Sequence, residues 1–139
     1  MSSYNKFSSF VEAVAEKVHN LSADSLKIML TNSAPIASNT VKANITDISA
    51  GNGYTAGGTA VTVSASSQTA GLYKLVGTHA GYTASGGTIG PFRYAVLYND
   101  TATNDELIAW WDYGSSITLA AGETVAITLD GTNGILTLQ

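Results

Sequence analysis

Short apolar segments separated by turn residues constrain the fold of this chain more than any other feature of its sequence. In LKIMLT (26–31), Leu26, Ile28 and Leu30 alternate with Lys27, Met29 and Thr31. A strand with one buried face has this period of two. Further strands are predicted at AVTVSAS (60–66), LYKLVG (72–77), FRYAVLYN (92–99) and LIAWWDY (107–113).

The C-terminal part continues the pattern with short segments and tight turns. SITLA (116–120), the turn AAGE and TVAITLD (124–130) predict a hairpin, and ILTLQ (135–139) predicts a last strand. No segment alternates a strand with a long helix, as a parallel α/β fold requires. The sequence therefore predicts an all-β fold, an antiparallel β-sandwich or jelly roll.

One amphipathic helix is predicted before the strands, at residues 4–19. Phe7, Phe10, Val11, Val14 and Val18 follow the i, i+3, i+4 spacing of a single apolar stripe. We expect this stripe to pack on the chain's own sheet or on a neighbouring subunit. The 139 residues suit a single domain, with a β-sandwich over 26–139 that contains a long loop at 32–60.

Charge and composition exclude several classes of function. The chain has six Lys and Arg against ten Asp and Glu, a net charge of −4, and its basic residues are scattered singly. Binding to nucleic acid or to an anionic membrane surface needs a basic patch, so we expect neither. The start of the chain at Met1 lacks a signal peptide, and no apolar run approaches the ~20 residues that span a bilayer. With no cysteine there is no disulfide framework.

The residues that carry chemistry do not form a recognisable catalytic or metal-binding motif. His19 ends the predicted helix, where we expect a solvated or capping role. His79 lies in a Gly-rich loop with no second His, Cys or clustered carboxylate nearby, so it does not indicate a metal site. Asp100, Asp105 and Glu106 offer hard oxygen ligands for calcium, but the spacing and glycine of an EF-hand are missing. We therefore interpret them as a solvated connector. No serine lies in a G-x-S-x-G elbow. We expect no enzymatic activity, no catalytic or metal-binding residue and no cofactor.

The adjacent tryptophans of LIAWWDY point to opposite faces if this segment is a regular strand. Leu107, Ala109, Trp111 and Tyr113 then share an apolar face, which we assign to the core. Trp110 lies on the other face with Ile108 and Asp112. A tryptophan side chain covers about 150–250 Å², so full exposure of Trp110 to water would be unusual. Three covers remain open: the N-terminal helix, a neighbouring subunit, or a sugar stacked on the ring.

Three segments of the chain resemble small structural proteins of tailed bacteriophages. They are GPFRYAVLYNDTATNDELIAWWDYGSSITLAAGETVAITLDGTNGILTL (90–138), LKIMLTNSAP (26–35) and ISAGNGYTAGG (48–58). The resemblance covers most of the chain, and proteins of this size and β-sandwich build include capsid decoration or cement proteins. It implies a protein of the outer capsid surface of the virion, assembled in the host bacterial cytoplasm, that stabilises the head through protein–protein contacts. The implied partners are the major capsid protein and further copies of the chain, as a dimer or trimer.

The expected contact residues come from the predicted helix at 4–19 and from the predicted strand LIAWWDY (107–113). They are Tyr4, Phe7, Phe10, Val14 and Trp110, with the 32–60 loop as a further source of contacts. An alternative expectation is a tail or fibre component with a receptor- or glycan-binding sandwich, in which Trp110 and Tyr98 stack on a sugar.

Overall fold

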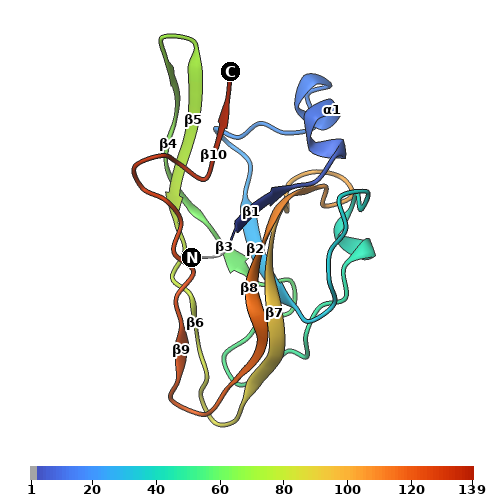
Figure 1. Cartoon of the computed structure of the whole chain (residues 1–139), viewed down its shortest axis with the longest axis vertical. Coiled ribbons are helices and arrows are strands. Elements are labelled where there is room, and N and C mark those ends of the chain that lie inside the picture. Colours follow the sequence, from blue (N-terminus) through green and yellow to red (C-terminus); the bar gives the residue numbers. More distant parts are fainter. Residues whose placement is uncertain (1–2) are drawn as a thin grey trace.

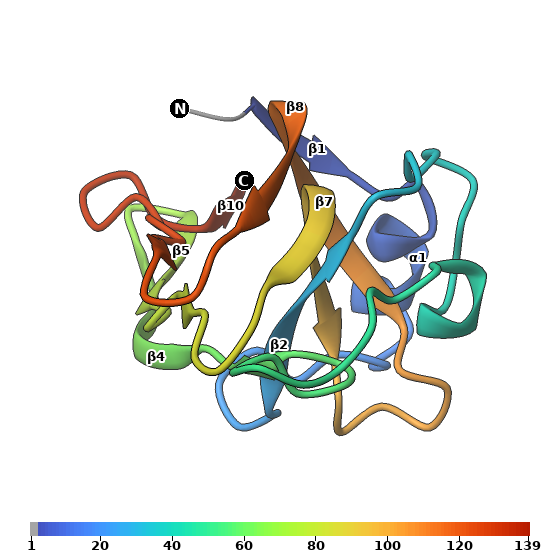
Figure 2. The same cartoon turned by 90° about the horizontal axis from the view of Figure 1, so that it is seen from below.

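The computed structural model describes residues 3–139 as two layers of antiparallel strands with one short α-helix (Figure 1 and Figure 2). The first layer is a five-stranded sheet, in the order β1 (Ser3–Lys6), β8 (Leu107–Leu119), β7 (Ile89–Asn99), β2 (Leu26–Thr31) and β3 (Thr59–Ala60). The second layer contains two smaller sheets, β10 (Leu136–Leu138), β5 (Leu72–Thr78) and β4 (Thr62–Thr69), and β6 (Tyr82–Thr83) with β9 (Thr124–Val125). The prediction of an all-β antiparallel fold with one N-terminal helix is confirmed.

The helical elements are short. They are α1 (Ser9–Ala15) and the single 3₁₀ turn η1 (Lys42–Asn44). Between β2 and β3 the chain is otherwise a loop, as expected for 32–60, apart from two isolated bridges, Val41 with Glu106 and Gly51 with Tyr54. Within residues 3–139, helix length and hydropathy do not reach what a membrane crossing needs.

The prediction of one helix over residues 4–19 is wrong at both ends. Tyr4, Asn5 and Lys6 belong to β1, which pairs with β8 and forms one edge of the five-stranded sheet. The helix ends after Ala15, because Lys17 adopts a left-handed φ of 68° and the Val18 N–H donates to the carbonyl of Ala13. This is the hydrogen-bond pattern of a Schellman motif. Pairing with β8 thus removes the first residues of the predicted helix, and the C-terminal cap removes the last ones. Helical periodicity in the sequence reports neither effect.

The predicted hairpin of 116–120 with 124–130 is also wrong. β8 runs without interruption from Leu107 to Leu119, and its far end pairs with β7, as Ile117 with Phe92 and Leu119 with Ile89. Only Thr124–Val125 is a strand in the following segment, and it pairs with β6 in the second layer. The turn after Leu119 therefore carries the chain from one layer to the other.

Both faces of the five-stranded sheet are covered by apolar side chains. The face toward the second layer carries two groups of buried residues, centred on Ile28, Leu97 and Leu75 and on Leu30, Phe92 and Tyr82. The opposite face carries a third group, which consists of Phe7, Met29, Val96, Tyr98 and Leu107 with Ile45 and Trp110 at its margin. The N-terminal segment and the 32–60 loop supply the cover on this side.

Candidate functional site

A β-bulge in β8 decides which residues share a face with each tryptophan. Leu97 pairs with Ala109 and Tyr98 with Leu107, so Ile108 is an extra residue in the ladder. Ile108 and Ala109 both pack between the layers, whereas Leu107 packs on the opposite face. The predicted grouping of Leu107 with Ala109 is therefore wrong, because it assumes unbroken alternation.

Trp110 is covered by the chain's own N-terminal segment. The ring of Phe7, in the turn between β1 and α1, lies 4.6 Å from the ring of Trp110 (centroid to centroid) at 46°. Tyr98 is fully buried, and its hydroxyl donates to the carbonyl of Gly57 at 2.6 Å. The predicted stacking of a sugar on Trp110 and Tyr98 does not fit this arrangement, because Tyr98 is fully buried and the Phe7 ring packs against Trp110.

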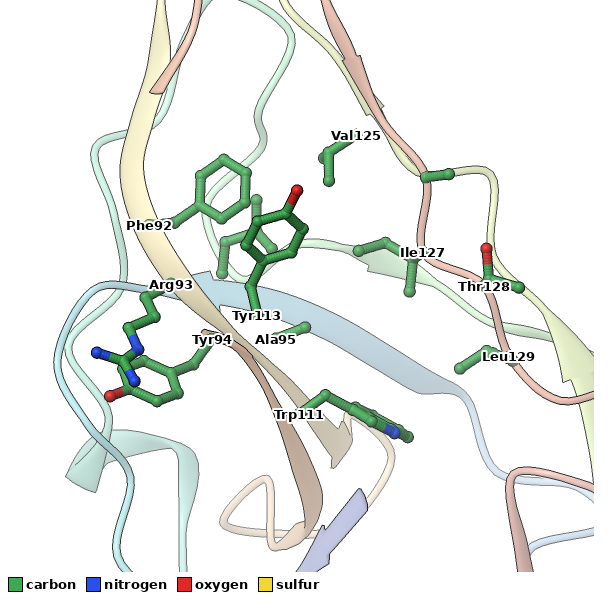
Figure 3. Close-up of a pocket in the computed structure, with 12 residues that line it drawn as sticks. Phe92, Arg93, Tyr94, Ala95, Trp111, Tyr113, Val125, Ile127, Thr128 and Leu129 are labelled. Carbon is green, nitrogen blue, oxygen red and sulfur yellow. The ribbon is translucent and has the colours of Figure 1, made fainter. Parts of the chain in front are cut away.

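Trp111 lies on the face toward the second layer, at the side of an apolar cleft of about 190 Å³ (Figure 3). Phe92, Ala95 and Trp111 line it from the five-stranded sheet, while Val125, Ile127 and Leu129 face them from the second layer. Tyr113 lines the same cleft but is 57% exposed, so its assignment to the core is wrong. This cleft lies between the two layers.

Asp112, next to the cleft, is neutralised by a neighbour. The guanidinium of Arg93 donates to the two carboxylate oxygens at 2.8 and 3.0 Å. These bonds, and a further one from the Gly114 N–H, hold the pKa of the Asp112 carboxyl below its usual range. Asp112 therefore stays ionised and forms an ion pair with Arg93.

The five predicted contact residues differ in how much surface they retain. Phe7 and Phe10 are fully buried in the chain's own core, whereas Tyr4 is 40% exposed and Val14 and Trp110 are half-buried. Only the last three keep surface that another protein can touch. As contact residues, all five remain predictions.

A second apolar groove connects the two ends of the chain. It has a volume of about 680 Å³ and lies between α1 with β1 on one side and β10 with the preceding turn on the other. Tyr4, Val11 and Leu138 line it, and all three are exposed large hydrophobic side chains, Val11 at 56%. We name this feature the terminal groove. Helical periodicity predicts Val11 on the apolar stripe, whereas the structure exposes it. No pattern in the sequence predicts the position of Leu138 beside α1, because the pairing of β10 with β5 sets it.

The 32–60 loop is fixed to the edge of β2 by tyrosine hydroxyls. The Tyr54 hydroxyl accepts from the Leu30 N–H at 3.0 Å and donates to Asp47. The Tyr82 hydroxyl, which comes from β6, donates to the carbonyl of Ile28 and accepts from the Thr59 N–H at 2.9 Å, where the loop enters β3. Burial, together with the bond to Asp47, raises the pKa of Tyr54 far above its usual value. Gly58 lets the loop approach β2 this closely, since it has a φ of +77° and a Cβ there would overlap the Ile28 carbonyl oxygen.

The histidines are held in separate small networks. Asn99 Nδ2 lies 2.9 Å from His19 Nδ1 and 2.7 Å from Asp24 Oδ2, and His19 Nε2 is buried without a hydrogen-bond partner. His79 contacts Thr59 Oγ1 at 2.9 Å. Residues 3–139 contain no group of three or more His, Cys, Asp or Glu arranged to hold a metal ion. In the predicted connector, Asp100 pairs with Lys27 at 3.1 Å.

Comparison of the chain with family models, with curated proteins and with solved structures found no match.

Proposed function

We propose that this chain is a non-enzymatic structural protein of a tailed-bacteriophage virion, and specifically a capsid decoration or cement protein. It acts by binding the major capsid protein on the outer surface of the head. The terminal groove is its contact surface. The observation that carries this assignment is the gathering of Tyr4, Val11 and Leu138, three exposed hydrophobic side chains, in one groove.

The chemistry of the terminal groove suits a protein partner. Aliphatic and aromatic side chains line it from both termini, and Lys6 is the charged residue among those that line it. Burial of apolar area is the main driving force of protein association. Two strand edges flank the groove, because β1 and β10 are each the outermost strand of a sheet. A partner segment that enters the groove can therefore bury apolar side chains and pair with the outer edge of β10.

The repeated surface of a capsid strengthens binding through a contact that is weak by itself. Small contact areas gain affinity when several copies are linked on one surface. A chain that binds as a dimer or trimer exploits this gain, since each bound copy raises the effective concentration of the others.

The copy number in purified particles tests the location. A decoration protein is present in a fixed ratio to the major capsid protein, whereas a tail or fibre component is present in far fewer copies. Quantitative mass spectrometry of dissociated particles measures this ratio. About a dozen copies or fewer, the number expected for a tail component of a symmetric particle, would contradict the proposal.

Rebinding to particles stripped of the chain tests the surface. Val11→Asp places a charge in the terminal groove at a side chain that is already 56% exposed, so folding is retained. We expect rebinding to weaken roughly tenfold or more, because the apolar contact is replaced by an unpaired carboxylate. Ile36→Asp is the matched control, since Ile36 is 57% exposed in the 32–60 loop. If Ile36→Asp weakens rebinding and Val11→Asp does not, the loop is the contact surface and the assignment to the groove is wrong.

The cleft beside Trp111 favours one second candidate, a tail or fibre component that binds a glycan. An exposed tyrosine and a half-buried tryptophan line the cleft together, and aromatic rings stack on the apolar faces of sugars. Tyr113→Ala removes the exposed ring without opening the core. Loss of binding to cells or glycans in a folded Tyr113→Ala variant supports this candidate, and unchanged binding excludes it.

A further inference from the structure

β4 is a long strand with an unprotected outer edge. It is the outermost strand of its sheet, in the order β10-β5-β4, and covers eight residues, Thr62–Thr69. Figure 1 shows β4 on the outer side of the β4–β5 hairpin, whose tip extends to one end of the molecule. Free strand edges are commonly protected by charged side chains, proline or very short length. The sequence TVSASSQT has no charged residue and no proline.

The geometry of the hairpin indicates which backbone groups point outward. Ala70 and Gly71 have φ values of 52° and 83°, as in the two-residue turn of type I′. The flanking pair, Thr69 with Leu72, is then hydrogen-bonded across the hairpin. Two residues back, Ser67 repeats this orientation, so Ser66 and Gln68 turn their N–H and C=O groups away from β5. Within residues 3–139, no backbone hydrogen bond reaches this outer edge.

The distribution of charge favours a second copy of this chain as the occupant of the edge. No charged residue lies between Asp47 and Lys74, a stretch that contains β3 and all of β4. The chain as a whole carries a net charge of −4, so two copies repel each other least where the charges are absent. A strand that pairs with its own antiparallel copy also avoids facing like charges, because β4 has none.

The side chains of β4 also suit self-pairing better than selection of a foreign strand. Six of the eight are exposed, and all are small or uncharged. Foreign strands are selected by pockets for alternate side chains. Of the residues in β4, only Ser66 lines one of the grooves described for residues 3–139, the hollow beside Val14 and His19.

We propose that β4 pairs with β4 of a second copy across a two-fold axis, joining two three-stranded sheets into one continuous six-stranded sheet. The outward groups of Ser66 and Gln68 supply the new hydrogen bonds. Such an isologous contact closes on itself and gives a dimer. It leaves the terminal groove open and stands independently of the proposed role on a capsid.

Charge substitution at Ser67 tests this pairing. Ser67 is exposed near the centre of β4, and when Ser66 and Gln68 of one copy pair with Gln68 and Ser66 of the other, the two Ser67 residues lie directly opposite each other on the two-fold axis. In Ser67→Lys or Ser67→Glu, like charges of the two copies meet across the new pair, so each variant alone should dimerise about tenfold more weakly than the wild type. An equimolar mixture of the two variants should dimerise again. Sedimentation velocity over a concentration series measures all three samples.

Ala121→Lys is the matched control, because it adds the same charge at an exposed alanine in the turn after β8. It should dimerise like the wild type. Amide exchange on the wild-type chain provides a readout that needs no variant: the N–H groups of Ser66 and Gln68 should exchange more slowly as concentration rises. A wild type that stays monomeric, a Ser67→Lys variant that dimerises like Ala121→Lys, or a mixture that fails to recover would each overturn the proposal.

Discussion

The two layers of this molecule differ in strand length, in backbone hydrogen bonding and in apolar cover. The five-stranded sheet has long central strands, β7 and β8, and apolar cover on both faces. The second layer is divided into two small sheets, and the segment 126–129 between β9 and β10 forms no backbone hydrogen bond within residues 3–139. The difference separates two tasks. The first layer supplies stability, and the second layer, with the ends of the chain, leaves edges and grooves free for contacts.

The largest expected effect follows from opening the cover of the first layer. Phe7 is fully buried against Trp110, so Phe7→Ala should lower the free energy of unfolding by about 3–5 kcal/mol. Val11→Ala, four residues later at a 56% exposed position, should change it by less than about 0.5 kcal/mol. Chemical denaturation measures both. Equal losses for the two variants would mean that Phe7 does not hold the first layer together.

A smaller effect is expected at the edge of β2, where the 32–60 loop is attached. Tyr54→Phe removes a hydroxyl that serves both the Leu30 N–H and Asp47, which leaves buried polar groups unpaired. Such a loss costs about 1–3 kcal/mol of unfolding free energy. Tyr113→Phe is the matched substitution at a hydroxyl that is exposed, and it should leave unfolding unchanged. If both variants unfold alike, the tyrosine bonds do not anchor the loop.

The smallest expected effect is a dependence of stability on pH in the range where histidines titrate. Burial lowers the pKa of His19 below its usual value, against the opposite influence of Glu106 and Asp24. Burial also lowers the pKa of His79. The unfolded chain therefore takes up protons first, so the contribution of both groups is fully present above about pH 6.5 and declines as the pH falls below it.

Substitution of each histidine in turn shows which of the two causes this decline in stability. His19→Gln should flatten the pH dependence more than His79→Gln, because His19 is buried against the first layer and His79 is half-buried beside β3. Thermal unfolding at a series of pH values between neutral and mildly acidic provides the comparison. A steeper decline in His19→Gln than in the wild type would show that its protonation stabilises the fold.

The sequence predicts the fold class because alternating apolar residues report directly on buried strand faces. LKIMLT (26–31) and FRYAVLYN (92–99) lie within β2 and β7 as expected. The failures occur where a distant contact overrides the local pattern. Residues 4–6 have helical periodicity but pair with β8, and Thr124–Val125 pairs with β6 rather than with the end of β8. No local signal distinguishes these partners.

The candidate sites were less accessible to sequence reasoning than the fold. Parity along LIAWWDY places Trp110 and Trp111 on opposite faces, but the bulge at Ile108 puts Leu107 on the face of Trp110 and Ile108 on the face of Trp111. The terminal groove lies between α1 and β10, which come from opposite ends of the chain, so no short sequence motif predicts it. The sequence predicts a strand at 60–66, but it does not predict the position of this strand at the margin of a sheet.

The most direct test of this division of tasks is residue-resolved amide exchange, compared between the free chain and the chain bound to particles. The central strands β2, β7 and β8 should be strongly protected in both states. On binding, new protection should appear in β1, α1 and β10 around the terminal groove. Protection that appears instead at Tyr113 and residues 125–129, with β1 and β10 unchanged, would contradict the account.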